Sequence, residues 1–296
     1  KGAVMMGRVM SDNHPCYNEE ARDYARMHIP VAPACNISCN YCNRKYDCLH
    51  ETRPGVTSEV LTPEEAFHKY SYVSGKVEKL SVVGIAGPGD ALANFPEVKR
   101  SIELIKGINP EVIFCLSTNG LNLPQYADQI IELGIKHVTI TINTLNPWIG
   151  AEIYKYVEYK GEYHFGIKGA DILINNQLEG LKYLAENGVQ CKVNIVMIKG
   201  INDKDIPALV KKAGKLGAVM TNIMPLIPAE GSQFADMPLA SRKELNSVRD
   251  QCSEFLKQMY HCQQCRADAI GQLTHDRSAE FRSCSSSFSK FLNSQI

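Results

Sequence analysis

Four cysteines lie within one short stretch of the chain, "PACNISCNYCNRKYDCLHE" (33–51). Cys35, Cys39 and Cys42 follow the spacing C-x3-C-x2-C, and Cys48 comes six residues later. Three thiolates this close together can surround a soft metal centre. Zinc normally takes four ligands, whereas a [4Fe–4S] cluster held by three cysteines keeps one iron open for another ligand. The spacing therefore favours an iron–sulfur site over three incidental thiols, which would be a liability when exposed.

A second close pair, Cys262 and Cys265, lies in "HCQQCRADAIG" (261–271). Alone, this C-x2-C spacing is ambiguous between half a zinc site, a redox pair and part of a cluster site. The surrounding pattern supports neither a zinc ribbon nor a thioredoxin-like redox pair. A role as ligands requires a partner from elsewhere in the chain, and Cys48 is available.

Single candidate ligands lie near two predicted strands. Cys115, in "VIFCLSTNG", alternates with apolar residues and shares its parity with Ser117, which predicts that both point away from the core; an inert buried cysteine is the alternative. Cys16 precedes the first predicted strand, and His28 opens that strand. A lone histidine is more often structural than a ligand, so His28 is a candidate only in combination with other groups.

Apolar runs alternate regularly with amphipathic segments between these motifs. Thr62, Pro63 and two glutamates in the first turn mark one helix start. About six strand–helix units predict a parallel sheet with right-handed crossovers, either an open doubly wound sheet or an incomplete barrel. The predicted strands are 27–33, 80–87, 111–120, 137–143, 190–198 and 219–226, and the predicted helices are 62–77, 95–107, 124–134, 174–188, 203–217 and 241–260.

The cysteine loop takes the place after the first strand where a nucleotide-binding fold would have G-x-G-x-x-G. In both architectures ligands bind at the carboxyl ends of the strands, so this position fits a site. Two segments interrupt the alternation. Residues 144–170 form a long connection that we interpret as a lid, and the Ser-rich segment from about Gly271 is expected to be a loosely held tail.

The bulk composition excludes several classes of function. The 296 residues are 44% hydrophobic and 22% charged, with a formal net charge of +0. This balance predicts no nucleic-acid partner and no membrane partner, and no secretion signal or apolar run of membrane-spanning length is apparent. Eleven cysteines in short clusters do not resemble a secreted disulfide framework. We expect a cytoplasmic protein.

The cysteine motif, with Tyr41 before its last cysteine, resembles the signature of the radical S-adenosylmethionine (SAM) superfamily. The resemblance implies an α/β fold, the partial (β/α)6 TIM-type barrel of that superfamily. It also implies that Cys35, Cys39 and Cys42 hold a [4Fe–4S] cluster whose open iron chelates SAM. Electron transfer from the reduced cluster would cleave SAM to methionine and a 5′-deoxyadenosyl radical that abstracts hydrogen.

Other motifs match superfamily elements that contact SAM. "GIAGPGDAL" (84–92) corresponds to a glycine-rich turn, "STNG" (117–120) ends the third predicted strand, and "TITIN" (139–143) ends the fourth. For each motif alone, an ordinary capped strand end is the better interpretation. Together with the cysteine motif, they give these expected SAM-site residues: Tyr41, Gly87, Gly89, Asp90, Ser117, Asn119, Thr141 and Asn143.

A closer resemblance, covering most of residues 13–271, is to the radical SAM maturases of the nitrogenase iron–molybdenum cofactor. The segments that carry it are "HPCY", "ARMHIPVAPACNISCNYCNRKYDC", "ETRPGVTSEVLTPEEA", "AGPGDAL", "LSTNG" and "CQQCRADAIG". By this resemblance two substrate clusters join the SAM cluster, making three [4Fe–4S] clusters in all. Cys16, His28 and Cys115 would hold one, and Cys48, Cys262 and Cys265 the other. The parts would be an N-terminal segment with one ligand (1–27), the barrel (28–261), and a C-terminal cluster-binding segment with its tail (262–296).

The resemblance also implies a reaction. Two [4Fe–4S] clusters would be fused into an eight-iron core with a central carbide, one SAM giving a methyl group to a cluster sulfide and a second supplying the radical. From their position just after Cys48, Glu51 is a candidate proton acceptor and Arg53 a candidate anion contact; ordinary surface residues are the alternative for both. Cys191, Cys252 and Cys284 remain plain thiols, and the alternation of residues around Cys191 predicts that it lies in the core. Implied partners are iron–sulfur cluster donor proteins, an electron donor such as a ferredoxin, and a downstream carrier or scaffold protein. We expect the stand-alone form, without the C-terminal carrier domain of some relatives.

Two alternatives remain open from the sequence. One is a different radical SAM enzyme that keeps its auxiliary clusters, such as a molybdenum-cofactor cyclase or a peptide-modifying enzyme. The other is a structural protein that bears zinc or a cluster and performs no turnover. Anaerobic iron and sulfide analysis discriminates among these hypotheses, because zinc, or only one cluster per chain, would exclude the closer resemblance.

Overall fold

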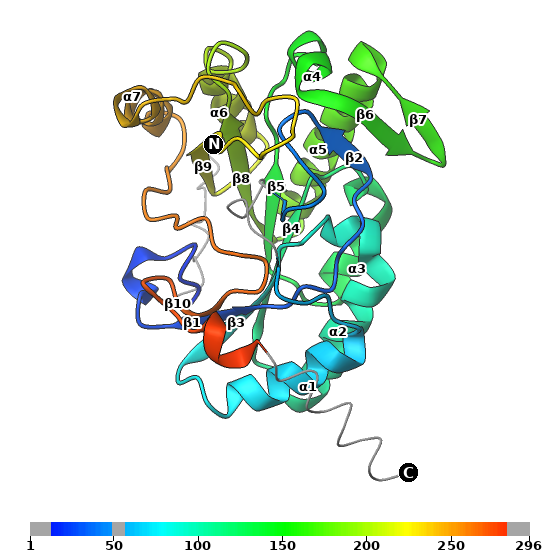
Figure 1. The fold of residues 1–296 in the computed structure, drawn as a ribbon, viewed down its shortest axis with the longest axis vertical. Coiled ribbons are helices and arrows are strands. Elements are labelled where there is room, and N and C mark those ends of the chain that lie inside the picture. The colour runs from blue at the N-terminus through cyan, green and yellow to red at the C-terminus, as the bar shows by residue number, and fades with distance from the viewer. Residues whose placement is uncertain (1–12, 49–56, 283–296) are drawn as a thin grey trace, which may run out of the picture.

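The computed structural model of the chain describes residues 13–48 and 57–282. Its main sheet has eight strands in the order β11-β10-β1-β3-β4-β5-β8-β9 (Figure 1). The six strands from β1 to β9 in this order pair in parallel. They are β1 (Ala25–His28), β3 (Leu80–Ile85), β4 (Ile113–Thr118), β5 (His137–Thr141), β8 (Gln190–Met197) and β9 (Met220–Pro225).

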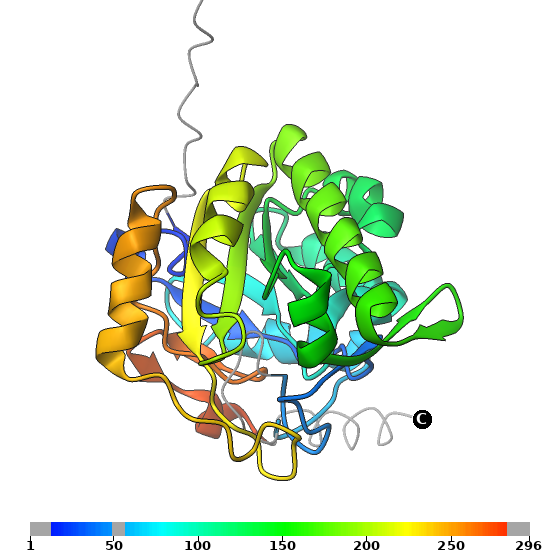
Figure 2. The same ribbon diagram turned by 90° about the horizontal axis from the view of Figure 1, so that it is seen from above.

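Each parallel strand is followed by a helix on the outer face of the curved sheet, as Figure 2 shows. The sheet does not close, because β9 pairs with β8 alone among the named strands while β1 pairs with β3 and β10. The architecture is therefore a partial (β/α)6 barrel, which confirms the predicted fold. The outer helices are α1 (Pro63–Ser74), α2 (Phe95–Ile108), α3 (Leu123–Glu132), α5 (Gly166–Glu186), α6 (Ile206–Lys215) and α7 (Arg242–Ser253).

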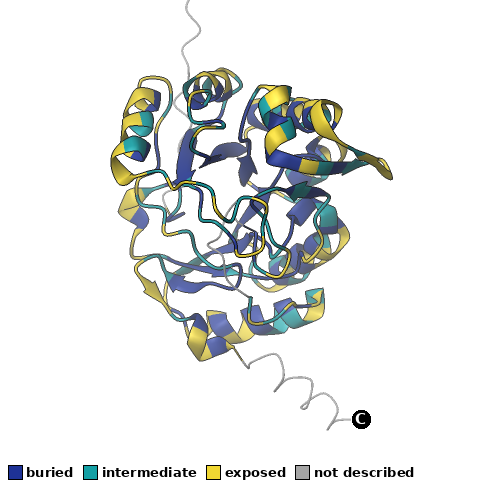
Figure 3. Cartoon of the chain, turned by 45° about the horizontal axis from the view of Figure 1, so that its top comes forward, coloured by how far each residue is buried: buried dark blue, intermediate teal, exposed yellow. Residues whose placement is uncertain are grey.

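Side-chain alternation along the strands separates the core from the lumen. Phe114 and Leu116 of β4, like Val193 and Ile195 of β8, belong to the main apolar core under the helices. The residues that alternate with these core residues along each strand face the inside of the barrel. The strands around it are coloured as buried in Figure 3. Local signals behave as expected at α1, where Thr62 and Glu65 form a capping box.

The C-terminal segment spans the open side of the barrel. The amide of Met259 donates to the carbonyl of Thr221 on β9 at 2.8 Å, and the amide of His28 on β1 donates to the carbonyl of Ala269 at 2.8 Å. In Figure 1 this segment is the orange chain that crosses from α7 to β10. The residues between these two attachments include both cysteines of the C-x2-C pair, so the fold places them at the mouth of the lumen.

The prediction of a loosely held tail from Gly271 is wrong for the described residues up to 282. Strand β10 (Ile270–Gln272) pairs antiparallel with β1, β11 (His275–Asp276) pairs with β10, and the 3-10 turn η3 (Ser278–Phe281) follows. The Arg26 side chain donates to the carbonyls of Gly271 and Gln272. These long-range hydrogen bonds leave no periodic pattern in the sequence.

The expected lid over 144–170 is instead a short helix and a hairpin fixed to the cysteine loop. Helix α4 (Pro147–Ile153) leads into β6 (Tyr154–Tyr159) and β7 (Glu162–His164). Strand β6 also pairs with β2 (Ile37–Cys39), which lies within the cysteine loop. The segment therefore supports the loop rather than covering it.

Several element boundaries also differ from expectation. Strand β1 ends at His28, before Pro30, and α5 begins at Gly166 rather than at 174. Helix α7 ends at Ser253, because residues 257–259 turn back to hydrogen-bond with β9. Short 3-10 turns η1 (Glu19–Ala21) and η2 (Ala91–Asn94) complete the described elements. Among the described residues, no helix has the length and apolar character needed to cross a bilayer.

Candidate functional site

The cysteine loop follows β1 at the carboxyl end of the strands. Pairing of β2 with β6 sets Cys39 opposite Tyr154, and the amide of Cys42 donates to the carbonyl of Cys39 at 3.0 Å. The Cys39 and Cys42 thiols share a hydrogen bond, and Cys35 is close enough to interact electrostatically with Cys39. The structure thus brings the three predicted ligands together.

The thiols of the loop are poor thiolates without a compensating cation. Burial, reinforced by the nearby Asp90, raises the pKa of Cys35 to about 12. Burial and the neighbouring thiols also raise the pKa of Cys39 well above its usual value. A metal centre bound by thiolates supplies the missing positive charge, which is why coordination deprotonates cysteine. The residues present therefore fit an iron–sulfur cluster.

The arrangement of the ligands differs from that of a zinc site. Among residues 13–48 and 57–282, no three His, Cys, Asp or Glu side chains converge on a position for one metal ion. A cubane cluster binds each thiolate through a different iron, so its ligands are spread more widely than those around one ion.

The glycine-rich turn after β3 holds both ends of the cysteine loop. The amide of Gly89 donates to the carbonyl of Ala32 at 2.6 Å, and the amide of Asp90 donates to that of Ala34 at 2.8 Å. At the other end of the loop, the amide of Cys48 donates to the carbonyl of Pro88 at 3.1 Å. Close approach requires glycine here, because a Cβ at Gly89 would lie 2.1 Å from the Ala34 carbonyl oxygen. Gly87, at φ +142°, also has a backbone conformation that favours glycine.

The Asp90 carboxylate is fully used within the protein. It accepts hydrogen bonds from the amides of Leu92, Ala93 and Asn119 and from the hydroxyl of Thr118. Burial raises the pKa of Asp90, although these hydrogen bonds oppose the shift. Asp90, one of the expected SAM-site residues, therefore joins the ends of β3 and β4, and its carboxylate already accepts hydrogen bonds from the protein.

Two asparagines support the loop from the neighbouring strands. The Asn143 amide donates to the hydroxyls of Tyr41 at 2.9 Å and Tyr154 at 3.2 Å, so it fixes the aromatic residue of the cysteine motif. The Asn119 amide donates to Asn36 at 2.7 Å and lies 3.8 Å from the Cys35 sulfur. Asn119 thus contacts residues next to the first cysteine of the loop, whereas Asn143 holds the ring of Tyr41.

A cavity inside the barrel collects most of the remaining candidate ligands. Its volume is about 50 Å³. Ser117 and Thr139 add hydroxyls to its lining. The hydroxyls of Thr139 and Thr141 are buried and have no hydrogen-bond partner among the described residues. The predicted ligands in its lining are Cys16, His28, Cys115, Cys262 and Cys265.

The structure does not separate these ligands into the two sets expected from the sequence. Cys262 and Cys265 lie with Cys16, and their charges affect its thiol. Cys48 is absent from the cavity lining; it sits beside Pro88 and interacts with Cys39 of the loop. Five of the six candidate ligands therefore share one cavity, and Cys48 belongs to the adjoining loop.

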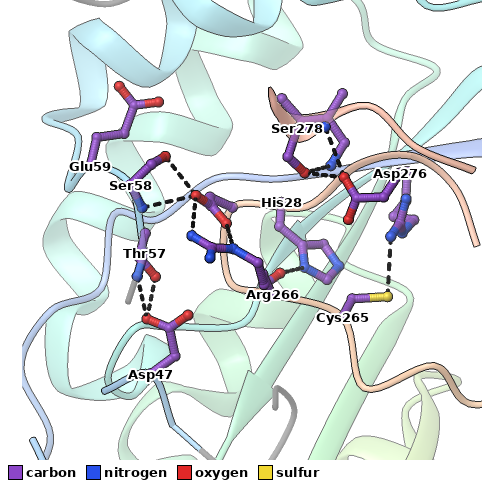
Figure 4. Close-up of polar contacts among 12 residues, drawn as sticks. His28, Asp47, Thr57, Ser58, Glu59, Cys265, Arg266, Asp276 and Ser278 are labelled. Carbon is purple, nitrogen blue, oxygen red and sulfur yellow. Dashed lines mark hydrogen bonds and ion pairs between the residues drawn. The ribbon is translucent and has the colours of Figure 1, made fainter. Parts of the chain in front are cut away.

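His28 has the arrangement of an imidazole ligand. Its Nδ1 lies 2.9 Å from the carbonyl of Arg266 (Figure 4), so Nδ1 carries the proton and Nε2 keeps a lone pair. Burial and the nearby Arg26 lower the pKa of His28 to about 4, so the ring is neutral near pH 7. The ring lies against Gly84, whose missing side chain makes room for it.

We expect Gly84→Ala to displace this ring. The new Cβ would lie 2.7 Å from Cδ2 and 3.1 Å from Nε2 of His28. Overpacking of this kind typically costs about 1–3 kcal/mol, measured as the free energy of unfolding in denaturant. Gly107→Ala is the control, because nothing lies within 4 Å of its Cβ, and it should stabilise helix α2 by about 0.5–1 kcal/mol. Equal stability of the Gly84→Ala and unaltered chains would contradict this packing.

A polar network ties the end of the cysteine loop to the C-terminal segment (Figure 4). Asp268 pairs with Arg266 at 2.8 Å and accepts hydrogen bonds from the amide and hydroxyl of Ser58 at 2.9 and 2.6 Å. Asp47, which precedes Cys48, accepts from the amide of Thr57 at 2.9 Å. Through residues 57 and 58, the network links the neighbour of Cys48 to the neighbour of Cys265.

Asp268→Asn should break this network. Although burial disfavours the charge, the bonds from Arg266 and Ser58 outweigh it and hold the pKa of Asp268 well below its usual range. Loss of these charge-assisted bonds should reduce the free energy of unfolding at pH 7 by about 2 kcal/mol. The contribution is complete above the ordinary carboxyl pKa of 3.8 and is lost as pH falls further.

The stability difference between the Asp268→Asn and unaltered chains should therefore be constant from pH 7 to pH 5. The exposed Asp171 supplies the matched control, Asp171→Asn, which should leave stability unchanged. A loss that grows or disappears between pH 7 and pH 5 would contradict the assignment to Asp268.

Sequence reasoning missed several charged or aromatic residues of the cavity. Arg26 donates through Nη2 to the Cys265 sulfur at 3.2 Å, and Lys192 lines the cavity from β8. His14 also lines the cavity, and its ring packs in edge-on or tilted contacts with Tyr17 and His137 behind it, with ring centroids 4.6–4.7 Å apart. Alternation was a usable signal for Lys192, because the same pattern that predicts Cys191 in the core assigns its neighbour to the lumen.

Two of the three cysteines expected to be plain thiols lie in the core, and three further predicted residues lie outside the described part of the chain. Cys191 is fully buried in the main core, as expected, and Cys252 is buried there from α7. Glu51, Arg53 and Cys284 fall outside the described residues.

Comparison with known proteins gives a family match. A family model described as the radical SAM superfamily matches residues 29–213. Over 274 residues the chain is 50% identical to the "FeMo cofactor biosynthesis protein NifB" of Bradyrhizobium diazoefficiens, covering 91% of this chain and 55% of that protein. It is 49% identical to NifB of Klebsiella pneumoniae, covering 90% and 58%, and 47% identical to NifB of Azotobacter vinelandii, covering 93% and 55%. The chain thus spans little more than half the length of these relatives.

Solved structures show the same fold. Streptococcus suis SuiB bound to S-adenosylmethionine superposes with a TM-score of 0.57 at 14% identity, covering 79% of this chain and 49% of that chain. Native anSMEcpe with bound AdoMet and Cp18Cys peptide gives 0.57 at 14% identity, covering 80% and 63%. At this identity the likeness establishes the architecture alone.

Proposed function

Because the chain belongs to the radical SAM superfamily, we propose that it cleaves SAM at a [4Fe–4S] cluster held by Cys35, Cys39 and Cys42, and does so in building the nitrogenase cofactor. The similarity to NifB proteins supports this role. The observation that carries the proposal is the cavity inside the barrel, which five candidate cluster ligands line together.

When bound, the reduced cluster supplies the electron that cleaves SAM to methionine and a 5′-deoxyadenosyl radical. The chain's own residues hold and shield this site. Gly89 fixes the loop entrance, Asn143 holds Tyr41, and Asn119 places an amide beside Cys35. The buried hydroxyl of Thr141 offers a further polar contact toward the lumen. A buried lumen of this kind can bind a ligand while limiting side reactions with water.

The proposed substrates are two [4Fe–4S] clusters, which would be fused into an eight-iron core with a central carbide. One SAM would give a methyl group to a cluster sulfide, and a second would provide the radical that abstracts hydrogen from it. We assign Cys16, His28 and Cys115 to one substrate cluster. Adjacent register supports this set, because His28 lies opposite Gly84 on β3 and Gly84 lies opposite Cys115 on β4.

We assign Cys48, Cys262 and Cys265 to the second substrate cluster. Cys48 lies outside the cavity lining, and the network through Asp47 and Asp268 supports its approach to the C-terminal pair. Incomplete ligation by protein suits clusters that must couple and then leave. Glu51 as proton acceptor and Arg53 as anion contact remain predictions on residues outside the description.

The partners and location of the whole protein are also part of the proposal. Cluster donor proteins, a low-potential electron donor such as a ferredoxin, and a carrier or scaffold for the product follow from the chemistry. A cytoplasmic location follows from the need to keep the clusters reduced.

Anaerobic iron, sulfide and zinc analysis of the reconstituted chain tests the proposal. Three cubes predict about twelve irons per chain, with matching acid-labile sulfide. Zinc in place of iron, or about four irons per chain, would contradict it. Iron that remains with the protein after turnover with an acceptor present would instead favour a radical SAM enzyme with permanent auxiliary clusters.

A further inference from the structure

We infer that an outer groove between α7 and the C-terminal segment is the route by which a thiolate-bound iron–sulfur cluster reaches Cys262. This inference rests on the proposed function, because it takes Cys262 as a ligand of a substrate cluster. The other residues that line the groove belong to no predicted ligand set and to no motif described above.

The groove lies at the edge of the sheet, beside β9, and its volume is about 580 Å³. Figure 1 shows α7 next to β9 at this edge, with the C-terminal segment leaving α7 beside them. Arg249 joins the two elements, because its guanidinium donates to the carbonyl of Ile223 on β9 at 2.7 and 3.1 Å. Pro225 at the end of β9 also lines the groove, so the space opens beside the carboxyl ends of the strands.

Cys262 connects this groove to the cavity inside the barrel. It lines both spaces, and no other residue of the described ranges 13–48 and 57–282 does so. Its partly buried side chain packs against two separate apolar clusters, one containing Met224 and the other Met259. A cluster that binds Cys262 from the groove therefore already has one of its ligands in the cavity.

The charge of the groove suits an anionic ligand. Arg242 and Arg249 are its charged residues, and no Asp or Glu is among the described residues that line it. Arg242 is exposed, and the Arg249 guanidinium lies over the ring of Tyr260, 5.5 Å from its centroid. The carboxylate of Asp250 lies beside the groove and accepts from the Tyr260 hydroxyl at 3.5 Å. An iron–sulfur cube with thiolate ligands has a net negative charge, which two arginines in an open groove attract.

Transfer to Cys262 is a ligand exchange at iron. A bond forms between one iron of the cluster and the Cys262 sulfur, and the bond from that iron to a thiolate of the donor breaks. The proton that Cys262 gives up leaves on the released thiol, so the exchange needs no oxidant and no reductant. Thiolates are the usual ligands of iron–sulfur clusters, so a cysteine in the lining of the groove can accept the cluster.

The test measures how fast the apo full chain takes up iron from a synthetic tetranuclear iron–sulfur complex that carries mercaptoethanol thiolates. Absorbance after rapid anaerobic mixing follows the uptake, and Cys262→Ser identifies the phase that requires this thiol. Arg242→Glu should slow that phase about 5–10-fold at low ionic strength and reduce its dependence on salt. Arg242→Lys keeps the charge and should restore the rate.

Lys243→Glu is the matched control, because it makes the same change of charge one residue away. Lys243 lines a different groove, together with Lys199 and Glu244, which form an ion pair at 2.7 Å. The helix dipole favours a glutamate in the first turn of α7, so neither glutamate variant should lose stability. The final iron content should be equal in the Arg242 and Lys243 variants and the unaltered chain, since the groove governs entry rather than retention.

The outcomes separate this inference from the proposed function. Equal uptake rates for Arg242→Glu, Lys243→Glu and the unaltered chain would overturn the entry route alone. Equal slowing by both variants would show an effect of net charge, and a lower final iron content of Arg242→Glu would show a structural role; either result would also overturn the route. An unaltered chain with no uptake phase that requires Cys262 would overturn the route together with the assignment of Cys262 to a substrate cluster.

Discussion

Cys39→Ala is expected to abolish reductive SAM cleavage by the reconstituted chain. Cys39 is buried on β2, opposite Tyr154, with a thiol bonded to Cys42. Its loss leaves two thiolates for the cluster and removes a buried side chain from the strand that holds the loop. Replacing even an outer-shell partner of a metal site typically lowers metal affinity or activity by about 10–100-fold. Removal of a direct ligand should therefore lower the SAM cleavage rate on the order of 100-fold or more.

The measurement is anaerobic 5′-deoxyadenosine formation with dithionite as reductant. Cys252→Ala is the matched control, because Cys252 is equally buried but lies in α7 away from the loop and the cavity. Its cleavage rate should remain close to that of the unaltered chain. Normal cleavage by Cys39→Ala, at normal iron content, would contradict the assignment of the loop to the SAM cluster.

Gly89→Ala should have the largest structural effect of any single methyl addition at the site. The new Cβ would lie 2.1 Å from the carbonyl oxygen of Ala34 and 2.7 Å from that of Pro33. Both neighbours are backbone, so relief requires the chain that enters the cysteine loop to move. Overpacking against a rigid backbone is expected to cost about 3 kcal/mol of unfolding free energy.

The same movement should reduce cluster binding and SAM cleavage together, because the displaced residues lead directly into Cys35. Denaturant unfolding of the apo chain and iron analysis after reconstitution measure the two effects. Gly107→Ala is again the control, since its added methyl meets open space. A Gly89→Ala chain with normal stability and a full iron content would show that the turn does not hold the loop.

The barrel could be predicted because its signals are local. Six strand–helix units, the capping box at Thr62 and the alternation around Cys115 and Cys191 depend on residues close in sequence. The closure across the open side could not be predicted in this way. It depends on β10, three residues long, pairing with β1 across more than 240 positions, and on single hydrogen bonds at residues such as Met259 and Ala269.

The candidate site likewise has parts that local sequence signals predict and parts that depend on long-range contacts. The spacing of Cys35, Cys39 and Cys42 identifies the loop without any long-range information. Polar residues at strand ends were also identifiable, but their partners were not: Asp90 and Asn143 both use their side chains within the protein. The grouping of Cys262 with Cys16 follows from a segment that crosses the lumen, which no short motif encodes.

The central claim is that the cysteine loop generates a radical from SAM and that the adjoining lumen presents a substrate that accepts a methyl group. Incubation of the fully reconstituted chain with SAM and dithionite tests both parts at once. The account predicts 5′-deoxyadenosine and S-adenosylhomocysteine together, the first from radical formation and the second from methyl transfer. The absence of both products from a chain with its full iron content would contradict it.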